Sequence, residues 1–173
     1  MRSIHAYFKL KGRSAHAAAA PHLGRSALDA VELMNVGVNY LREHMIDEAR
    51  IHYAVTNTGG LAPNVVQAEA EVTYLIRATK PDQVKELYDR GVNCSRGAAL
   101  MTQTMVDFDI QDSFHNLIPN KTLEKVMHQY MQEIGAPLAT EQDINYAKTI
   151  YETFTDEEKR AAALQVGIKE ILN

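Results

Sequence analysis

The 173-residue sequence lacks the features that mark several special classes of protein. It contains one cysteine, Cys94, so an internal disulfide is excluded. No apolar run approaches the ~20 residues that a membrane-spanning helix needs, and lysine and arginine are scattered without a basic run. Together with a net charge of −4, these absences argue against a membrane protein and against a nucleic-acid binder.

The first residues show no signal-peptide pattern, because residues 4–10 alternate between apolar and polar side chains instead of forming an apolar block. We therefore expect a cytoplasmic protein. The same alternation predicts a half-buried strand over residues 3–11. Its two faces carry Ile4, Ala6, Phe8 and Leu10 on one side and His5, Tyr7, Lys9 and Lys11 on the other.

Strand-like and helix-like segments follow one another over the first two thirds of the chain. Apolar residues recur every three or four positions over residues 25–45 and 82–101, which predicts two amphipathic helices. We expect Ser26 to cap the first helix and Leu100 to lie on the inner face of the second. Alternation predicts three further strands, over residues 51–57, 69–79 and 104–112. This order predicts an α+β fold, a ferredoxin-like four-stranded antiparallel sheet with two helices on one face, plus a C-terminal helical segment.

The pattern changes after Ser113, and the remaining sequence is helical without a strand. We therefore expect residues 1–113 to form one domain and residues 114–173 to form a separate helical segment. Three helices are predicted in that segment, over residues 120–134, 140–153 and 155–173.

His16 stands out because it lies in an alanine-rich loop between the first strand and the first helix. The spacing of the histidines does not match a metal site, and no catalytic triad surrounds His16 in the sequence. On the residues alone, His16 is a loop histidine without a role. If it does chemistry, it acts on something that another chain or another domain holds.

Two motifs carry a family resemblance. The first is Gly12-x-x-Ala15-His16-Ala17 with Pro21 and Gly24, followed by Ala27-Leu28-Asp29-Ala30. The second is Asn64-Val65-Val66, followed by a strand that ends in Leu75-Ile76-Arg77-Ala78. In this order and spacing they resemble the small lid, or dimerisation, domain of the zinc-dependent aminoacylase and carboxypeptidase family, and within it the aminobenzoyl-glutamate utilisation branch. The sequence departs from the family pattern at Gln67, where many members have proline, and by one extra alanine between His16 and Pro21.

The resemblance implies a longer, two-domain parent enzyme that cleaves an amide bond next to a carboxylate-bearing group such as glutamate. Residues 1–113 would be the lid, and residues 114–173 would belong to the returning catalytic domain. The zinc or manganese ions of the parent would be held by that domain, so we expect no metal and no cofactor in this chain and no activity from it alone. The implied partners are a second copy joined through an edge of the lid sheet, a small amide substrate and, as a further candidate, a second hydrolase subunit.

The resemblance also implies roles for three residues. His16 would cross the dimer interface and stabilise the oxyanion that forms in the partner's active site. Asn64 would contact the substrate, and Arg77 would bind the carboxylate of the substrate, a task that suits a planar guanidinium. Without the resemblance, Asn64 is interpreted as a turn residue and Arg77 as a solvated strand residue.

A second hypothesis belongs to a different class of function. The chain would then be a free-standing ferredoxin-like module that binds a small ligand or another protein through its sheet. The coding sequence on either side of the chain distinguishes the two hypotheses.

Overall fold

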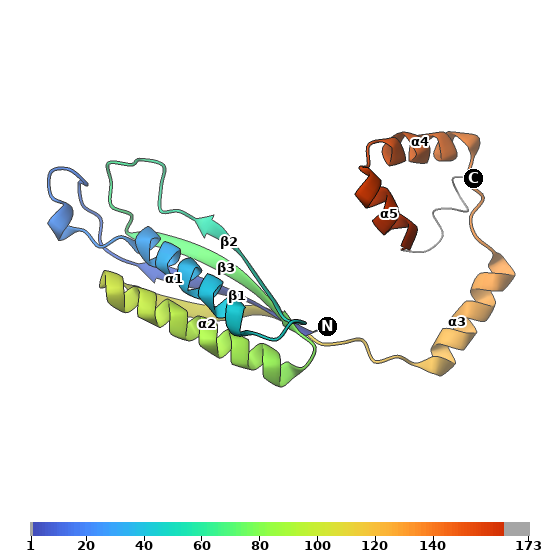
Figure 1. The fold of residues 1–173 in the computed structure, drawn as a ribbon, viewed down its shortest axis with the longest axis horizontal. Helices are drawn as coiled ribbons and strands as arrows, with labels where there is room; N and C mark the ends of the chain where they lie inside the picture. Colours follow the sequence, from blue (N-terminus) through green and yellow to red (C-terminus); the bar gives the residue numbers. More distant parts are fainter. Residues whose placement is uncertain (1, 165–173) are drawn as a thin grey trace. The chain divides into compact units, whose positions relative to one another are not determined.

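The computed structural model describes residues 2–164, and the chain divides into two compact units between Leu117 and Ile118. The first unit contains four strands and two long helices (Figure 1). In chain order they are β1 (Arg2–Lys11), α1 (Ala27–Leu41), β2 (Arg50–Asn57), β3 (Glu69–Ala78), α2 (Pro81–Thr102) and β4 (Met105–Phe114). Two short 3-10 helices, η1 (Pro21–Leu23) and η2 (Arg42–His44), lie in the connections.

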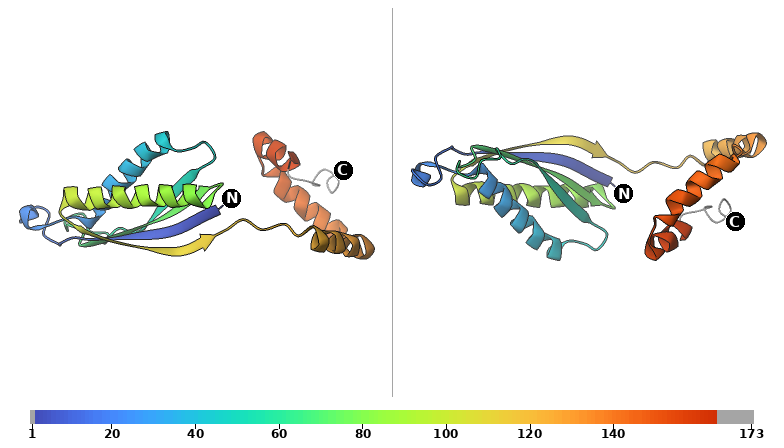
Figure 2. Two further views of the ribbon diagram at one scale, coloured as in Figure 1. Left: turned by 90° about the horizontal axis from the view of Figure 1, so that it is seen from below. Right: turned by 90° about the horizontal axis from the view of Figure 1, so that it is seen from above.

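The four strands form one antiparallel sheet in the order β2-β3-β1-β4. Both helices lie on the same face of this sheet (Figure 2). The predicted α+β fold, a ferredoxin-like sheet with two helices on one face, is confirmed. β2 and β4 are the two edges, because β1 and β3 are each paired on both sides.

The hydrophobic core lies between the sheet and the two helices. Phe8 of β1 has no exposed surface, and its ring packs edge-on against Tyr74 with the ring centroids 5.6 Å apart. The Tyr74 hydroxyl donates a hydrogen bond of 2.5 Å to Oδ1 of Asn35, which is also buried. Burial raises the pKa of Tyr74, so the phenol remains protonated and keeps this bond.

The helix boundaries follow local chemistry. Ser26 caps α1 as predicted, because its hydroxyl accepts a hydrogen bond of 3.0 Å from the backbone N–H of Asp29. The α-helix ends at Leu41, earlier than predicted, and the chain continues into η2. Pro81 occupies the first turn of α2, where its missing N–H costs nothing.

The prediction that Leu100 lies on the inner face of α2 is wrong, because 81% of its surface is exposed. The buried stripe of α2 passes through Ser95, Ala98 and Ala99, and Leu100 is rotated about 100° from Ala99 toward the solvent. β4 extends to Phe114, beyond the predicted end, and contains a bulge where His5 pairs with Asp112 while the next residue of β1 pairs with Ile110.

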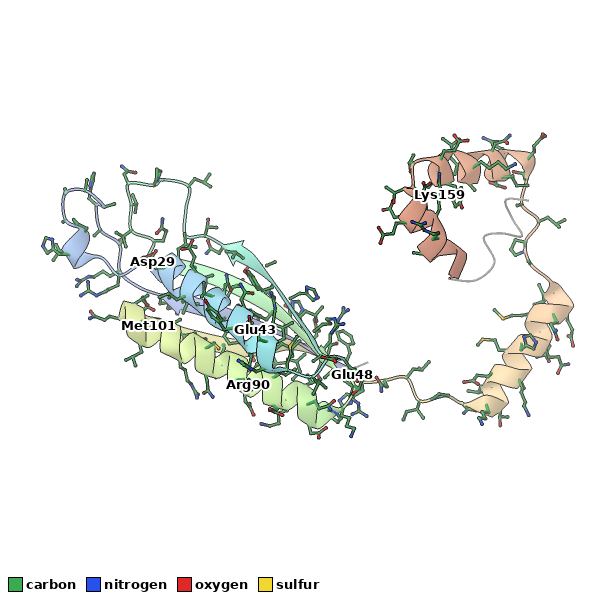
Figure 3. The ribbon with its side chains drawn as sticks, viewed as in Figure 1. Asp29, Glu43, Glu48, Arg90, Met101 and Lys159 are labelled. Atoms are coloured by element: carbon green, nitrogen blue, oxygen red, sulfur yellow. The ribbon has the colours of Figure 1, made fainter. Side chains whose placement is uncertain are left out.

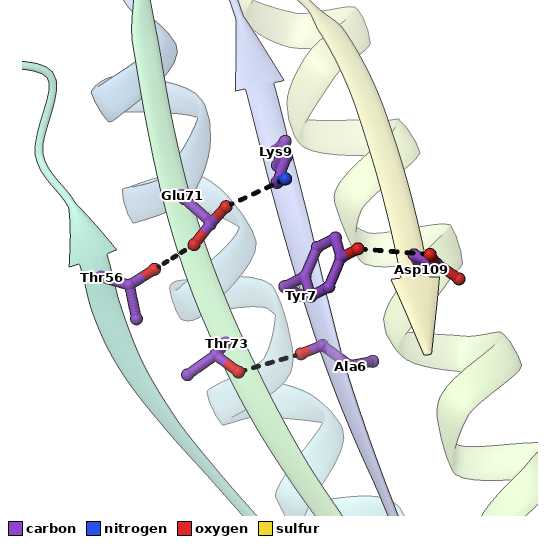
Figure 4. Close-up of polar contacts among 7 residues, drawn as sticks. All are labelled: Ala6, Tyr7, Lys9, Thr56, Glu71, Thr73 and Asp109. Atoms are coloured by element: carbon purple, nitrogen blue, oxygen red, sulfur yellow. Dashed lines mark hydrogen bonds and ion pairs between the residues drawn. The ribbon is translucent and has the colours of Figure 1, made fainter. Parts of the chain in front are cut away.

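The helix-free face of the sheet is polar (Figure 4). Glu71 accepts a hydrogen bond of 2.7 Å from Thr56 and forms an ion pair of 3.6 Å with Lys9. Tyr7 donates a hydrogen bond of 3.2 Å to Asp109 on the edge strand β4. This face is therefore stabilised by polar contacts between neighbouring strands and contributes little to the apolar core.

Up to Leu164, the second unit contains three helices, α3 (Lys121–Ile134), α4 (Glu141–Glu152) and α5 (Asp156–Leu164). Each begins at a capping residue, because Asn120, Thr140 and Thr155 accept hydrogen bonds from backbone N–H groups of the first turns. The predicted end of the last helix, near Asn173, lies outside the described residues. Over residues 2–164, no helix is both long enough and apolar enough to cross a membrane.

Candidate functional site

The loop that carries His16 leaves the end of β1 and is bound at both ends to other segments. At its base, Arg13 and Arg25 exchange two backbone hydrogen bonds of 2.8 Å each. Farther out, the N–H of Ala17 donates to the carbonyl of Asn64 at 2.9 Å, and the N–H of Val66 donates to the carbonyl of Ala15 at 2.9 Å. These bonds place His16 beside residues 64–66, so the two sequence motifs meet in space.

The glycines of the first motif have a steric role. A Cβ atom at Gly12 would lie 1.9 Å from the backbone oxygen of Arg25, and one at Gly24 would lie 2.9 Å from the side chain of Val66. At Gly12 the obstacle is backbone, so only glycine allows this approach, and at Gly24 a side chain would displace Val66.

The backbone around His16 determines which ring nitrogen carries the proton. Nδ1 of His16 accepts hydrogen bonds from the backbone N–H groups of Ala18 at 3.2 Å and Ala19 at 3.1 Å. Because Nδ1 accepts, the proton of the neutral ring is on Nε2. The side chain is exposed, so its Nε2–H can donate a hydrogen bond to a group outside this chain.

The alanines after His16 use their backbone N–H groups within the loop. In addition to the bonds already described, the N–H of Ala20 donates to the carbonyl of His16 at 3.0 Å. The run that contains the extra alanine is therefore a hydrogen-bonded turn around His16. Gln67 stands where many family members have proline. Its Oε1 accepts a hydrogen bond of 3.3 Å from the Ser26 hydroxyl, which a proline side chain cannot do.

Asn64 lies next to the His16 loop, but Arg77 does not. Asn64 is exposed and follows a glycine turn in which Gly59 has a φ of +79°. Arg77 is exposed near the other end of β3, where its register partners are Ser3 and Arg50. It lies eight positions beyond Glu69, the first residue of β3, so the two residues are about 26 Å apart at ~3.3 Å per residue. Because the His16 loop is hydrogen-bonded to residues 64–66, which precede Glu69, His16 and Arg77 lie toward opposite ends of β3.

The remaining histidines form no metal site in the described part of the chain. No group of three or more histidine, cysteine, aspartate or glutamate side chains over residues 2–164 could hold a metal ion. His5 has a different environment, because Nε2 lies 2.8 Å from the Thr73 hydroxyl and Nδ1 lies 3.5 Å from a carboxylate oxygen of Asp112. It links three strands of the sheet.

Two arginines that the sequence motifs do not single out support the loop. Nε of Arg13 donates to the carbonyl of Leu23, and Nη1 of Arg25 donates to the carbonyls of His22 and Gly24 at 3.1 Å and 2.5 Å. A pattern of residue types does not reveal these contacts, because the acceptors are backbone carbonyls.

The two edges of the sheet differ in chemistry. Edge strand β4 carries Asp107, Asp109 and Asp112, and charged side chains on an edge oppose pairing with another strand. Edge strand β2 has no acidic residue. Large apolar side chains are exposed on both edges and on α1, and they are Tyr53 and Val55 on β2, Met105, Ile110 and Phe114 on β4, and Leu33, Val36 and Tyr40 on α1.

Comparisons with known proteins identify relatives of this chain. The family model of the peptidase dimerisation domain matches residues 2–99. The chain is 48% identical over 160 residues to a p-aminobenzoyl-glutamate hydrolase subunit of Escherichia coli K12, a match that covers 92% of this chain and 33% of that protein. It is 34% identical over 134 residues to the Xaa-Arg dipeptidase of Mus musculus, covering 77% of this chain and 31% of the dipeptidase.

The structure matches that of the aminobenzoyl-glutamate utilization protein from Klebsiella pneumoniae with a TM-score of 0.64 and 19% identity. This match covers 78% of this chain and 34% of the Klebsiella chain, and it shows a shared fold. The chain thus spans about a third of the length of the curated relatives it matches.

Proposed function

Because the chain belongs to the peptidase dimerisation domain family, we propose that it is the lid and dimerisation part of a longer metal-dependent amidohydrolase. The parent enzyme cleaves an amide bond next to a carboxylate-bearing group. The name of the Escherichia coli relative, at 48% identity, supports an aminobenzoyl-glutamate-like substrate.

The observation that carries this proposal is the geometry of His16. Two backbone N–H groups fix Nδ1, and the exposed Nε2–H is left as a hydrogen-bond donor. A donor held in a fixed direction suits an oxyanion, since it needs no reorganisation when negative charge develops on the scissile carbonyl oxygen. Removing one such donor costs roughly 3–4 kcal/mol of transition-state stabilisation in comparable sites.

The separation within one chain supports a site shared between two copies. His16 and Asn64 lie at one end of the sheet, and Arg77 lies near the other end. We propose that His16 and Asn64 reach the active site of the partner copy. Arg77 binds the carboxylate of the substrate that its own copy holds.

The sheet edge formed by β2, together with the exposed face of α1, is the proposed dimer contact. The three carboxylates of β4 oppose strand pairing at that edge, whereas β2 carries no carboxylate. A two-fold axis at β2 would join two four-stranded sheets into one continuous sheet.

The metal ions of the parent belong to residues outside this chain in our proposal. No set of side chains over residues 2–164 fits a metal ion, so no catalytic step is assigned to a metal here. We assign residues 114–173 to the returning catalytic domain, which would hold zinc or manganese through its other parts. We further propose a cytoplasmic enzyme that pairs with a second hydrolase subunit, which affinity purification of the parent from its source can test.

The decisive experiment uses two inactive variants of the full-length parent. One variant carries His16→Ala. The other keeps His16 but has a substitution at one metal ligand of the parent's catalytic domain. Neither homodimer turns over substrate, but mixing and reassociation restores activity, because the intact metal site receives His16 from the other copy. His22→Ala, in the same loop, is the matched control and keeps near-normal turnover.

Two results would overturn the proposal. Near-normal turnover by His16→Ala would remove His16 from the mechanism, and a mixture that stays inactive would place His16 in the site of its own copy. Hydrolysis by the purified 173-residue chain with added zinc or manganese would contradict the assignment of the metal site to other residues. A reading frame that begins at Met1 and ends at Asn173 would favour the free-standing module.

A further inference from the structure

An open cavity of about 360 Å³ lies at the base of the His16 loop. We name it the Arg13 pocket, and its walls are Lys11, Gly12, Arg13, Arg25, Gln103 and Met105. These residues come from the end of β1, the base of the loop, the residue after α2 and the start of β4. Figures 1 and 2 show η1 and the C-terminal end of α2 at the same end of the sheet, and Figure 3 labels Met101 there.

The Arg13 pocket has a strongly one-sided charge. Three of its six lining residues are cationic, and none is acidic. Glu69 is the register partner of Lys11 on β3, but over residues 2–164 no carboxylate lies within ion-pair distance of Lys11. Nε of Arg25 donates a hydrogen bond of 2.7 Å to Oε1 of Gln103, a neutral side chain that leaves the positive charge of Arg25 in place.

Both arginines are held in place and still have donors to offer. Nε of Arg13 is bound to Leu23, and Nε and Nη1 of Arg25 are bound to Gln103 and to loop carbonyls. A guanidinium has five N–H donors, so within residues 2–164 Nη1 and Nη2 of Arg13 and Nη2 of Arg25 make no hydrogen bond to the protein. Positioned guanidiniums bind planar or tetrahedral oxyanions with charge-assisted hydrogen bonds.

We propose that the Arg13 pocket binds a small free oxyanion of the phosphate or carboxylate class, and that the bound anion fixes the base of the His16 loop. Lys11 supplies a point charge, and Arg13 supplies two parallel donors. The cavity has room for such an ion with water, since one water takes about 30 Å³ of liquid volume.

The consequence for the loop follows from its hydrogen bonds. Arg13 and Arg25 form the backbone pair that closes the loop, and their side chains hold Leu23, His22 and Gly24. An anion that bridges the two guanidiniums therefore couples this closure to β1 through Lys11. Binding makes opening of residues 14–24 rarer and keeps the His16 ring oriented.

The test is a titration of the isotope-labelled 173-residue chain with sodium phosphate at constant ionic strength, followed by the amide signals of Gly12, Arg13, Arg25 and Gln103. Saturable shifts at these amides and slower hydrogen exchange over residues 14–24 are expected. Acetate in a parallel titration separates the two anion classes, and tighter binding of either one identifies the ligand.

The variants separate a built site from general attraction to a cationic surface. Lys11→Gln weakens binding about tenfold, as expected for one charge-assisted contact. Lys9→Gln, two positions earlier on the same strand and paired with Glu71, leaves the affinity unchanged. Shifts that do not saturate with either anion, or equal weakening by both substitutions, would overturn the proposal without touching the roles of His16 and the dimer.

Discussion

In the unit that ends at Leu117, Phe8 and Val72 have no exposed surface, whereas in the unit that begins at Ile118 the apolar residues Leu123 and Ile134 expose 63% and 83% of theirs. Both units have regular, well-capped elements. They differ in whether the apolar side chains of those elements are covered. Local sequence therefore determines the helices of both units, while of the helices α1, α2, α3 and α4 only α1 and α2 have buried side chains.

The apolar stripe of α3 shows what the second unit lacks. Leu123, Val126, Met127, Tyr130 and Ile134 follow helical spacing and line an open cavity of about 460 Å³. Within the described residues, no side chain of α3 is buried. This exposure supports our proposal that residues 114–173 belong to a catalytic domain whose remaining parts lie outside this chain.

The largest expected difference between the two units is in the response to a large-to-small substitution. Phe8→Ala creates a cavity in the core and lowers the free energy of unfolding by about 3–5 kcal/mol. Leu123→Ala on α3 changes it by no more than about 0.5 kcal/mol, because the side chain is already exposed. Denaturant unfolding followed by circular dichroism gives the free energy of unfolding of each variant and of the wild type. Equal losses would show that α3 is part of the packed core.

A buried hydrogen bond gives the next largest effect. Tyr74→Phe leaves Oδ1 of Asn35 buried without its donor, which lowers the free energy of unfolding by about 1–3 kcal/mol. The matched variant Tyr130→Phe, on α3, is nearly neutral because its hydroxyl is in water. A destabilisation by Tyr130→Phe that equals that of Tyr74→Phe would contradict the comparison.

Glycine substitutions test whether the packing of the first unit extends to the His16 loop. Gly12→Ala forces a Cβ atom against the backbone of Arg25 and costs about 1–3 kcal/mol, with faster hydrogen exchange over residues 13–25. At Gly97 of α2 there is no atom within 4 Å of the added Cβ, so Gly97→Ala stabilises by up to about 1 kcal/mol. The expected signs are opposite, and a harmless Gly12→Ala would show that the loop is not held by this contact.

The smallest effect concerns pH and the caps of the second unit. Hydrogen bonds from Thr140 lower the pKa of Asp143, and hydrogen bonds from Thr155 lower the pKa of Glu158. A lowered folded-state pKa means that this stabilisation is present above the usual values of 3.8 and 4.5 and is lost as pH falls through the folded-state pKa values. Amide chemical shifts of α4 and α5 are expected to show helix loss on acidification. Asp143→Asn removes this pH dependence from α4, and an unchanged acid transition there would contradict the assignment.

Much of the fold follows from side-chain periodicity. Alternation predicts the four strands, and the three-to-four spacing predicts α1 and α2, because each element packs one face against a single core. Leu100 shows the limit of this reasoning. The buried stripe near it consists of Ser95, Ala98 and Ala99, and small residues carry almost no hydrophobic signal that would orient the helix.

The site was predictable only in part for related reasons. The motifs place His16 and Asn64 in loops, but their proximity depends on backbone hydrogen bonds between residues 15–17 and 64–66. The proton position on His16 and the supports given by Arg13 and Arg25 also involve backbone atoms, which every residue has. A sequence shows residue types, and it cannot show which backbone groups will form hydrogen bonds with a given side chain or loop.

Dimerisation through β2 and α1 is open to a direct test by sedimentation equilibrium of the 173-residue chain. We expect a mass of twice 19.3 kDa for the wild type, dissociation by Val36→Lys on the exposed face of α1, and an intact dimer for Leu100→Lys on α2. A wild-type mass of 19.3 kDa at every concentration, or dissociation by Leu100→Lys but not by Val36→Lys, would contradict this dimer.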